Sequence, residues 1–283
     1  VKDLTGKVNK LDTYPFESGG VADIYRGSLK SFQSPVRVAV KIFRRMHSER
    51  ETLERTSRRL KREVDVWARL THKNVLPFIG VCDDIAPWPV LISPFYKFGH
   101  IATYLKKHPS TNRQELVHGV ASGLQYLHAH DIIHGDLKVQ NVLIDKRGCP
   151  CITDFGISKV LSARGFTTCS VGTAPYMAPE LFFVLDGTTE KETSPNTTKS
   201  SDVYSFALMV LEILTSEPPK GRPSRPIVTA QILADLRPKR TDYDEHKVTP
   251  ETWSVLDRCW TFETHLRPEI FEVLRELKWR WNM

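Results

Sequence analysis

The amino-acid sequence predicts an α+β fold in which a small antiparallel β-sheet domain precedes a larger, mostly helical domain. Strand-like segments separated by turns fill the chain up to about residue 95, with one long helix among them. After Gly99 the hydrophobic spacing changes to that of helices. Two short strands, at 142–144 and 151–153, follow a polar loop at 133–141 and interrupt the helical part.

Alternating side chains identify the clearest strand of the first domain at 35–41. Val38 and Val40 lie on one face of this strand, and Ala39 and Lys41 lie on the other. A flat base can therefore lie against small Ala39 while the cationic Lys41 reaches its phosphates. Further strands of this domain are expected at 8–43, 75–82 and 89–95.

The helix of the first domain begins at a capping-box signature, 48–51, and is expected to run to Leu70. Val64 and Trp67 belong to its apolar stripe, and Glu63 adjoins the stripe, so the Glu63 carboxylate can face inward. The helices of the second domain are expected at 101–107, 111–129, 201–215, 227–236, 252–260 and 269–281.

Composition argues for an ordinary globular chain and against two other classes. Of 283 residues, 40% are hydrophobic, but no apolar run approaches the roughly 18 residues of a membrane span. The longest candidate, near 206–214, is interrupted by Glu212 and is interpreted as a buried helix. The formal charge of +7 includes a basic cluster at 58–62 on one predicted helix, which is typical of a solvated face. We therefore expect no specific nucleic-acid binding.

Five cysteines, an odd number, do not make a disulfide framework in a chain of this size. A reducing compartment fits best, so we expect an intracellular, cytoplasmic location. The first residue is Val rather than Met, which suggests a domain cut from a longer protein.

The strongest functional signal is the loop Ile133–Asn141, followed by Asp154. Asp136, Asn141 and Asp154 supply three oxygen donors within a short window, with Lys138 between the first two. Such a set can position Mg²⁺ and a nucleoside triphosphate opposite a hydroxyl whose proton must be accepted.

These residues resemble the H-R-D-L-x-x-x-N and D-F-G motifs of the eukaryotic protein kinases, with Phe155 and Gly156 completing the second. The resemblance covers about 14–281 and implies the two-lobed protein kinase fold. Residues 1–283 are then one kinase domain, with an N-lobe at about 1–96, a hinge at 94–99 and a C-lobe at about 100–283. ATP and Mg²⁺, or Mn²⁺ in its place, are expected to bind between the lobes.

The resemblance gives each motif residue a role. Asp136 orients the attacking hydroxyl and accepts its proton, Asn141 and Asp154 bind the metal, and Lys138 neutralises the γ-phosphate. Lys41 resembles the lysine of the kinase V-A-I-K strand. Its expected partner is Glu63.

The Gly-rich loop departs from the kinase pattern G-x-G-x-x-G-x-V. Aligned at 17–24, it keeps Gly19, with Gly20 beside it, but has Glu17 and Ala22 in place of the first and third glycines. A carboxylate and a methyl group at these positions are expected to weaken nucleotide binding. The other nucleotide contacts implied by the resemblance are Ile24, Ala39, the small gatekeeper Ser93, the carbonyl of Pro94, the N–H of Tyr96, and Leu143.

The segment 172–180 resembles the kinase segment that receives the peptide substrate and ends in A-P-E. Its Thr173 is a candidate to hydrogen-bond the catalytic Asp136 and Lys138. Asp202 matches the helix aspartate that braces the catalytic loop, and Arg267 matches the arginine that pairs with the A-P-E glutamate. The residue in that glutamate position is Glu180.

Gly135 stands where the kinase motif has Arg. In many kinases that Arg pairs with a phosphorylated residue of the activation loop. The candidates for phosphorylation are Thr167, Thr168 and Ser170. Because no guanidinium is present at Gly135, we expect activity without activation-loop phosphorylation.

The implied function is a protein serine/threonine kinase of intracellular signalling that phosphorylates Ser or Thr hydroxyls of protein substrates. Lys138 is typical of serine/threonine kinases, whereas Cys259 and Trp260 before Arg267 resemble tyrosine kinases. The nearest group is therefore the tyrosine-kinase-like serine/threonine kinases. The alternative is a pseudokinase that acts as a nucleotide-binding scaffold, which Glu17 and Gly135 favour. A small-molecule kinase is disfavoured by segment 172–180.

Overall fold

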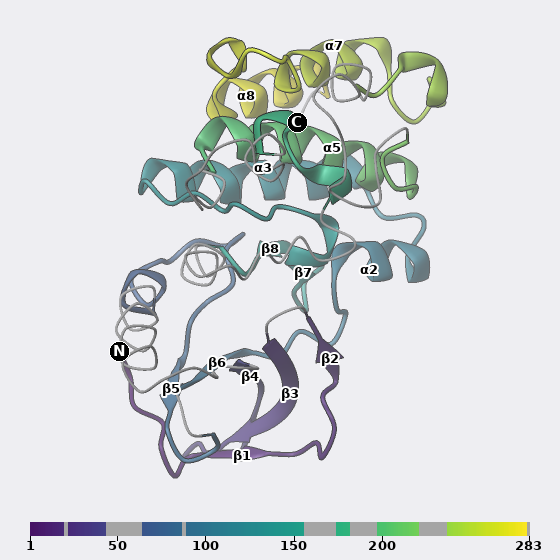
Figure 1. Ribbon diagram of the computed structural model, residues 1–283. Coiled ribbons are helices and arrows are strands. Elements are labelled where there is room, and N and C mark those ends of the chain that lie inside the picture. The colour runs from purple at the N-terminus through teal and green to yellow at the C-terminus, as the bar shows by residue number, and fades with distance from the viewer. Residues whose placement is uncertain are drawn as a thin grey trace. The chain divides into compact units, whose positions relative to one another are not determined.

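The computed structural model describes residues 1–19, 22–43, 64–86, 89–155, 174–181, 197–220 and 237–281. The chain forms two compact units, Val1–Lys97 and Phe98–Met283 (Figure 1). The strands of the first unit are β1 (Val8–Lys10), β2 (Glu17–Ser18), β3 (Ala22–Leu29), β4 (Val36–Phe43), β5 (Gly80–Cys82) and β6 (Val90–Pro94).

One antiparallel sheet forms the first unit. Its order is β1-β3-β4-β6-β5, and β2 also pairs with β3. Val38 and Val40 of β4 are fully buried, while Ala39 and Lys41 are half-buried, as the alternation predicts. One face of this sheet therefore packs into a hydrophobic core, and the other presents the half-buried Ala39 and Lys41.

One hydrophobic core cluster of the first unit lies on the Val40 face of the sheet. Its buried members are Leu4, Val8, Val38, Val40, Cys82, Val90 and Ile92. The N-terminal segment reaches this core by running beside β5, where Leu4 N donates to Val81 O at 2.7 Å. Gly80 permits that approach, because a Cβ there would lie 2.4 Å from Lys2 O.

The predicted strand at 75–82 is too long. Only Gly80–Cys82 is a strand, because Val75 and Leu76 are buried by side-chain packing rather than by pairing. Trp67 Nε1 donates to Leu76 O at 2.7 Å, which uses a carbonyl that a strand would give to its neighbour. The helix expected at 48–70 is described only from Val64, and residues 64–67 are helical.

The second unit is mostly helical. Its helices are α2 (Ile101–Lys107), α3 (Arg113–Ala129), α5 (Lys199–Thr215), α7 (Pro250–Cys259) and α8 (Ile270–Arg280), with short 3₁₀ turns η1 (Val139–Asn141), η2 (Ala174–Tyr176), η3 (Pro179–Leu181), η4 (Arg240–Asp242) and η5 (Thr264–Leu266). The hairpin β7 (Val142–Ile144) and β8 (Pro150–Ile152) is its sheet. The helix expected at 227–236 lies outside the described residues.

Helix α5 is the centre of the second unit. Every residue from Ser201 to Thr215 is buried, so the helix is covered on all sides, and it contacts α2, α3 and α7 (Figure 1). Thr198 caps its start: its hydroxyl accepts from Ser201 N at 3.0 Å, and Ser201 Oγ accepts from Thr198 N at 2.9 Å. A helix fixed in this way is a rigid base for side chains near its first turn.

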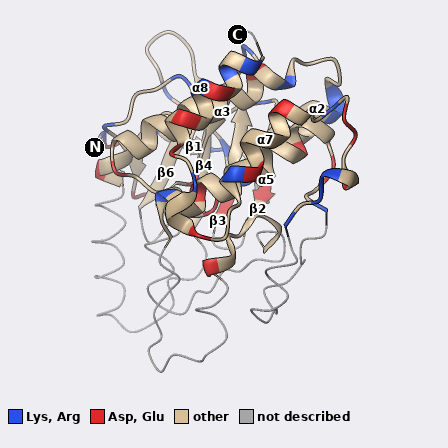
Figure 2. Cartoon of the chain, turned by 90° about the horizontal axis from the view of Figure 1, so that it is seen from above, with Lys and Arg blue, Asp and Glu red and all other residues tan. Residues whose placement is uncertain are grey.

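Charges on the second unit are interspersed in sign over its helices (Figure 2). Arg258 of α7, for example, pairs with Glu276 of α8 at 2.6 Å. No helix of the described ranges is long and apolar enough to cross a membrane. A sheet unit followed by a helical unit confirms the predicted α+β class.

Candidate active site

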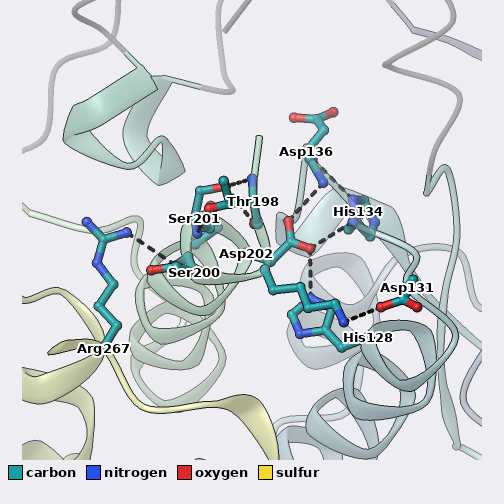
Figure 3. Close-up of polar contacts among 12 residues, drawn as sticks. His128, Asp131, His134, Asp136, Thr198, Ser200, Ser201, Asp202 and Arg267 are labelled. Carbon is teal, nitrogen blue, oxygen red and sulfur yellow. Dashed lines mark hydrogen bonds and ion pairs between the residues drawn. The ribbon is translucent and has the colours of Figure 1, made fainter. Parts of the chain in front are cut away.

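Asp202, in the first turn of α5, holds the backbone of the loop around Asp136 (Figure 3). Its carboxylate is 1% exposed and accepts from His134 N at 2.7 Å and from Gly135 N at 2.8 Å. His128, near the end of α3, places Nε2 2.9 Å from the same carboxylate. Three donors thus surround one buried acceptor, and the loop is fixed to the central helix.

His134 is completely buried, and its hydrogen bonds identify its tautomer. Nδ1 accepts from Asp136 N at 3.2 Å, so Nε2 carries the proton and donates to Thr153 O at 3.0 Å. Burial lowers the pKa of His134, and the nearby carboxylates of Asp202 and Asp136 oppose this shift without reversing it. A neutral imidazole therefore links the loop to the end of β8.

Two residues of the site have left-handed backbone. Gly135 has φ +77°, a value that glycine adopts without steric cost. Asp154 has φ +62°, which Asp tolerates better than most residues with a side chain. The turn at Gly135 allows two successive amides, of His134 and Gly135, to point at Asp202.

The two carboxylate oxygens of Asp136 differ in their contacts. Oδ2 accepts from Lys138 Nζ at 2.8 Å and from Asn141 Nδ2 at 3.1 Å. Oδ1 is buried and has no hydrogen-bond partner among the described residues. In Figure 3 the carboxylate points away from Asp202. One oxygen is therefore held by the protein, and the other is left to accept a hydrogen bond.

Asn141 and Asp154 are brought together by the β7–β8 hairpin. Val142 pairs with Ile152, and one step further along Thr153 N donates to Asn141 O at 2.9 Å. Asp154 follows directly, so it is the next residue after the one whose amide binds Asn141. Since Asn141 Nδ2 donates to Asp136, Oδ1 is the amide atom that remains as a candidate cation ligand. A carboxylate and an amide oxygen suit Mg²⁺, which usually completes its shell with water and phosphate.

Leu143 shows the opposite exposure pattern to its neighbours on β7. Val142 and Ile144 are fully buried, and Leu143 is half-buried on the other face. The segment before α2 pairs with this strand through His100 and Leu143. The Leu143 side chain thus offers an apolar contact on the exposed face of the hairpin.

In the first unit, the sheet register groups the proposed nucleotide residues on one face. Lys41 lies opposite Ile24 on β3 and opposite Leu91 on β6, and Ala39 lies opposite Ser93. Directly opposed residues share a face. Ser93 is 7% exposed, whereas Pro94 and Tyr96 at the end of β6 are half-buried. Gly19 N donates to Ala22 O at 2.9 Å, which links the residue after β2 to the first residue of β3.

Arg267 anchors the A-P-E segment as expected from its side-chain chemistry. Its fully buried guanidinium donates to both carboxylate oxygens of Glu180, at 2.7 and 2.8 Å, and to Ser200 O at 3.2 Å. Tyr176 is held too: its hydroxyl donates to Glu212 of α5, and Ser205 Oγ donates to Tyr176 O at 2.9 Å. The segment is thereby attached to the same helix as the Asp136 loop.

Several predicted site residues fall outside the described ranges, namely Gly20, Glu63, Gly156, Thr167, Thr168, Ser170 and Thr173. Two contacts escaped sequence reasoning. No local motif indicates that His128 contacts Asp202, 74 residues away. No local motif indicates that Tyr176 contacts Glu212 either. Phe155, the residue after Asp154, is 6% exposed.

Comparison with known proteins agrees with these motifs. The family model "protein tyrosine and serine/threonine kinase" matches residues 14–277. Similar proteins include the Arabidopsis thaliana serine/threonine-protein kinases STY17, 32% identical over 92% of this chain and 43% of that protein, and STY46, 29% identical over 92% and 42%. The receptor protein-tyrosine kinase CEPR1 of the same plant is 31% identical over 92% of this chain and 28% of that protein.

The chain spans less than half the length of these relatives. The family match nevertheless covers nearly all of the present sequence and confirms the resemblance inferred from its motifs. The chain therefore belongs to the protein tyrosine and serine/threonine kinase family, as a tyrosine-kinase-like eukaryotic protein kinase catalytic domain.

Proposed function

We propose that this domain transfers the γ-phosphoryl group of ATP to Ser or Thr hydroxyls of protein substrates. The observation that carries the proposal is the asymmetry of Asp136. Lys138 and Asn141 fix Oδ2, while buried Oδ1 has no partner among the described residues. An oriented, unsatisfied carboxylate oxygen is what a hydroxyl proton needs as its acceptor.

In the proposed reaction the substrate hydroxyl donates its hydrogen bond to Asp136 Oδ1. The hydroxyl oxygen forms a bond to the γ-phosphorus, the bond from phosphorus to the β–γ bridging oxygen breaks, and the proton passes to Asp136. ADP leaves with the bridging electrons. Lys138, 2.8 Å from Oδ2, places its ammonium where charge develops on the transferred group.

Asn141 Oδ1 and the Asp154 carboxylate are the proposed ligands of Mg²⁺, or of Mn²⁺. When bound, the cation neutralises phosphate charge. Thr153 links these two residues in the hairpin, since its N donates to Asn141 O and its hydroxyl to Asp154 Oδ1 at 3.3 Å. The protein's own contribution is to hold the two oxygen ligands on adjacent strand ends.

In the first unit, Lys41 is proposed to bind the phosphates and Ala39 to contact the base. Glu63 is the proposed partner of Lys41, and Ser93 is the proposed gatekeeper. The register that puts Ala39, Lys41 and Ser93 on one sheet face supports this assignment. The remaining proposed contacts are Gly19, Gly20, Ile24, Pro94, Tyr96 and, in the second unit, Leu143.

Residues 1–283 are proposed to act as one kinase domain in intracellular signalling. Thr173 is proposed to contact Asp136 and Lys138 within the substrate segment. Support for Ser/Thr specificity comes from Lys138 and from the names of two similar proteins. The cysteines of the described ranges, Cys82, Cys149, Cys151 and Cys259, are not joined in disulfides, which is consistent with a reducing compartment.

The test is phosphate transfer from γ-labelled ATP by purified protein to a generic protein substrate, followed by phosphoamino-acid analysis. We expect phosphoserine and phosphothreonine, dependence on Mg²⁺, and loss of transfer in Asp154→Asn. Nucleotide binding without transfer by the wild type would instead support the scaffold alternative. Phosphotyrosine as the main product would contradict the proposed specificity.

A further inference from the structure

Glu17 shares a sheet face with Lys41. Glu17 lies directly opposite Ile24, and Ile24 lies directly opposite Lys41, so the three residues form one row across β2, β3 and β4. Directly opposed residues of antiparallel strands project to the same side. With neighbouring strands about 4.8 Å apart, the Glu17 and Lys41 backbones are separated by about 10 Å. Both side chains are long enough to reach into the space between.

The Lys41 ammonium lies near the end of β4. Its Nζ is 5.8 Å from the centroid of the Phe43 ring, and Phe43 lies opposite Ala22, the first residue of β3. Under the proposed function, on which this inference rests, the phosphates lie beside this ammonium. Exposed Glu17 therefore projects its carboxylate to the same face as the phosphates.

A second carboxylate of the same hairpin lies on the other face. Asp23 is opposite Ser18, whose hydroxyl donates to Asp23 Oδ1 at 2.8 Å. Asp23 is also opposite Ile42, which packs against the core cluster on the Val40 face. The hairpin thus carries two adjacent carboxylates, and Glu17 is the one that faces the proposed phosphates.

We infer that Glu17 makes nucleotide binding selective for the phosphate charge, so that ATP alone is disfavoured more strongly than ATP whose charge a divalent cation has partly neutralised. Repulsion from one carboxylate is proportional to the charge of the ligand. It is strongest for ATP alone, about half as strong for MgATP, and absent for adenosine. Glu17 is therefore a specificity-determining residue, which adds to the metal dependence of nucleotide binding.

The experiment compares Glu17→Gln with its matched control Asp23→Asn, since each removes one negative charge from the same hairpin. Dissociation constants are measured by calorimetry for ATP with EDTA, MgATP and adenosine. At low ionic strength we expect Glu17→Gln to tighten ATP about tenfold and MgATP about threefold, with adenosine unchanged. Asp23→Asn should change none of them by more than about twofold, because its charge lies behind the sheet.

Added salt should reduce the gain in affinity of Glu17→Gln, since ions screen the repulsion between the Glu17 carboxylate and the phosphates. An equal gain for adenosine, an equal gain in Asp23→Asn, or no gain for ATP would each overturn the inference. Weaker adenosine binding in Glu17→Gln would overturn it too, because it would show a carboxylate that binds the nucleoside. Thermal unfolding verifies that both variants are folded.

The failure of this inference is distinct from that of the proposed function. If the wild type binds MgATP and transfers phosphate but Glu17→Gln binds with the same affinity, only the role of Glu17 is wrong. If neither protein binds any nucleotide at millimolar concentration, the nucleotide site and the role of Glu17 are both wrong. Binding that appears only in Glu17→Gln supports the inference.

Discussion

Asn141 holds Asp136 by one amide group: its Nδ2 donates to the Asp136 backbone carbonyl at 2.7 Å and to Oδ2 at 3.1 Å. A single side chain thus fixes both the backbone and the rotamer of the proposed base. Because the same Asn is a proposed metal ligand, the position of the base and that of the metal are coupled through one residue. Asp136 and Asn141 are five positions apart, and the turn η1 between them brings the Asn141 side chain back to Asp136.

The role of Asp136 can be tested by Asp136→Asn. We expect turnover to fall by about 10²–10⁴, the usual contribution of a positioned acid or base. MgATP affinity should change less than turnover, because Asn at this position keeps an oxygen that can accept from Lys138 and Asn141. Steady-state phosphate transfer and nucleotide titration measure the two quantities. Near-normal turnover in the variant would remove Asp136 from the mechanism.

Asp202 is expected to be important for stability as well as for activity. Asp202→Asn replaces an acceptor of three buried donors by a group that can accept fewer, and should cost about 2–4 kcal/mol of unfolding free energy. Asp131→Asn is the matched control, since its partner Lys199 is at 2.6 Å but the Asp131 side chain is 90% exposed. Urea unfolding should show no measurable change for the control. Equal losses in the two variants would contradict the role given to Asp202.

Because His134 is buried, we expect the free energy of unfolding to decrease as the pH falls. Its folded pKa is lowered from 6.5 by burial, so below pH 6.5 the unfolded chain binds a proton that the folded chain does not. Stability is therefore complete above pH 6.5 and decreases as the pH falls toward the folded pKa, by at most about 1.4 kcal/mol per pH unit for this group.

The control for this pH dependence is His134→Gln, which keeps an amide donor for Thr153 but does not titrate. Its unfolding free energy between pH 7 and pH 5 should have a shallower slope than that of the wild type, by up to one proton. Parallel curves would show that another group causes the acid sensitivity.

Activity is expected without phosphorylation of the activation loop. Gly135 has no side chain to receive a phosphate, and its φ of +77° serves the backbone turn toward Asp202. We test this with a variant in which Thr167, Thr168 and Ser170 are all changed to Ala. Its phosphate transfer should stay within about threefold of the wild type, because position 135 has no arginine to bind a phosphorylated residue. Abolished activity in a folded triple variant would refute the hypothesis.

The small side chain of Ser93 is expected to favour inhibitors that carry a bulky group behind the base. Its small side chain lies opposite Ala39, so a compound with a bulky group behind the base should bind tightly to the wild type. Ser93→Phe fills that space and should weaken such a compound by more than about tenfold, because overpacking a closed site costs about 1–3 kcal/mol. ATP affinity serves as the control and should be retained. Equal inhibition of both proteins would show that the space is not there.

Local sequence patterns were enough to predict the fold class and the identity of the chemical groups. Alternation in β4 fixed which residues share a face with Lys41, and the spacing of Asp136, Asn141 and Asp154 indicated a phosphoryl-transfer site. Both are local properties, because strand periodicity and short loops depend on neighbouring residues only. The predicted ends of the elements were less accurate, as at Val75 and Leu76, which are buried by packing and not by strand pairing.

Contacts between residues far apart in the chain depend on the tertiary structure. The resemblance implied that Asp202, 68 residues from His134, braces the Asp136 loop, but no local pattern indicated that His128, 74 residues from Asp202, joins the same hydrogen-bonded cluster. The same holds for Glu17, since a carboxylate in a short strand acquires its face only from the pairing of β2 with β3 and of β3 with β4. Register and helix packing are set by the burial of the whole core, and so they fix which charge faces the proposed phosphates.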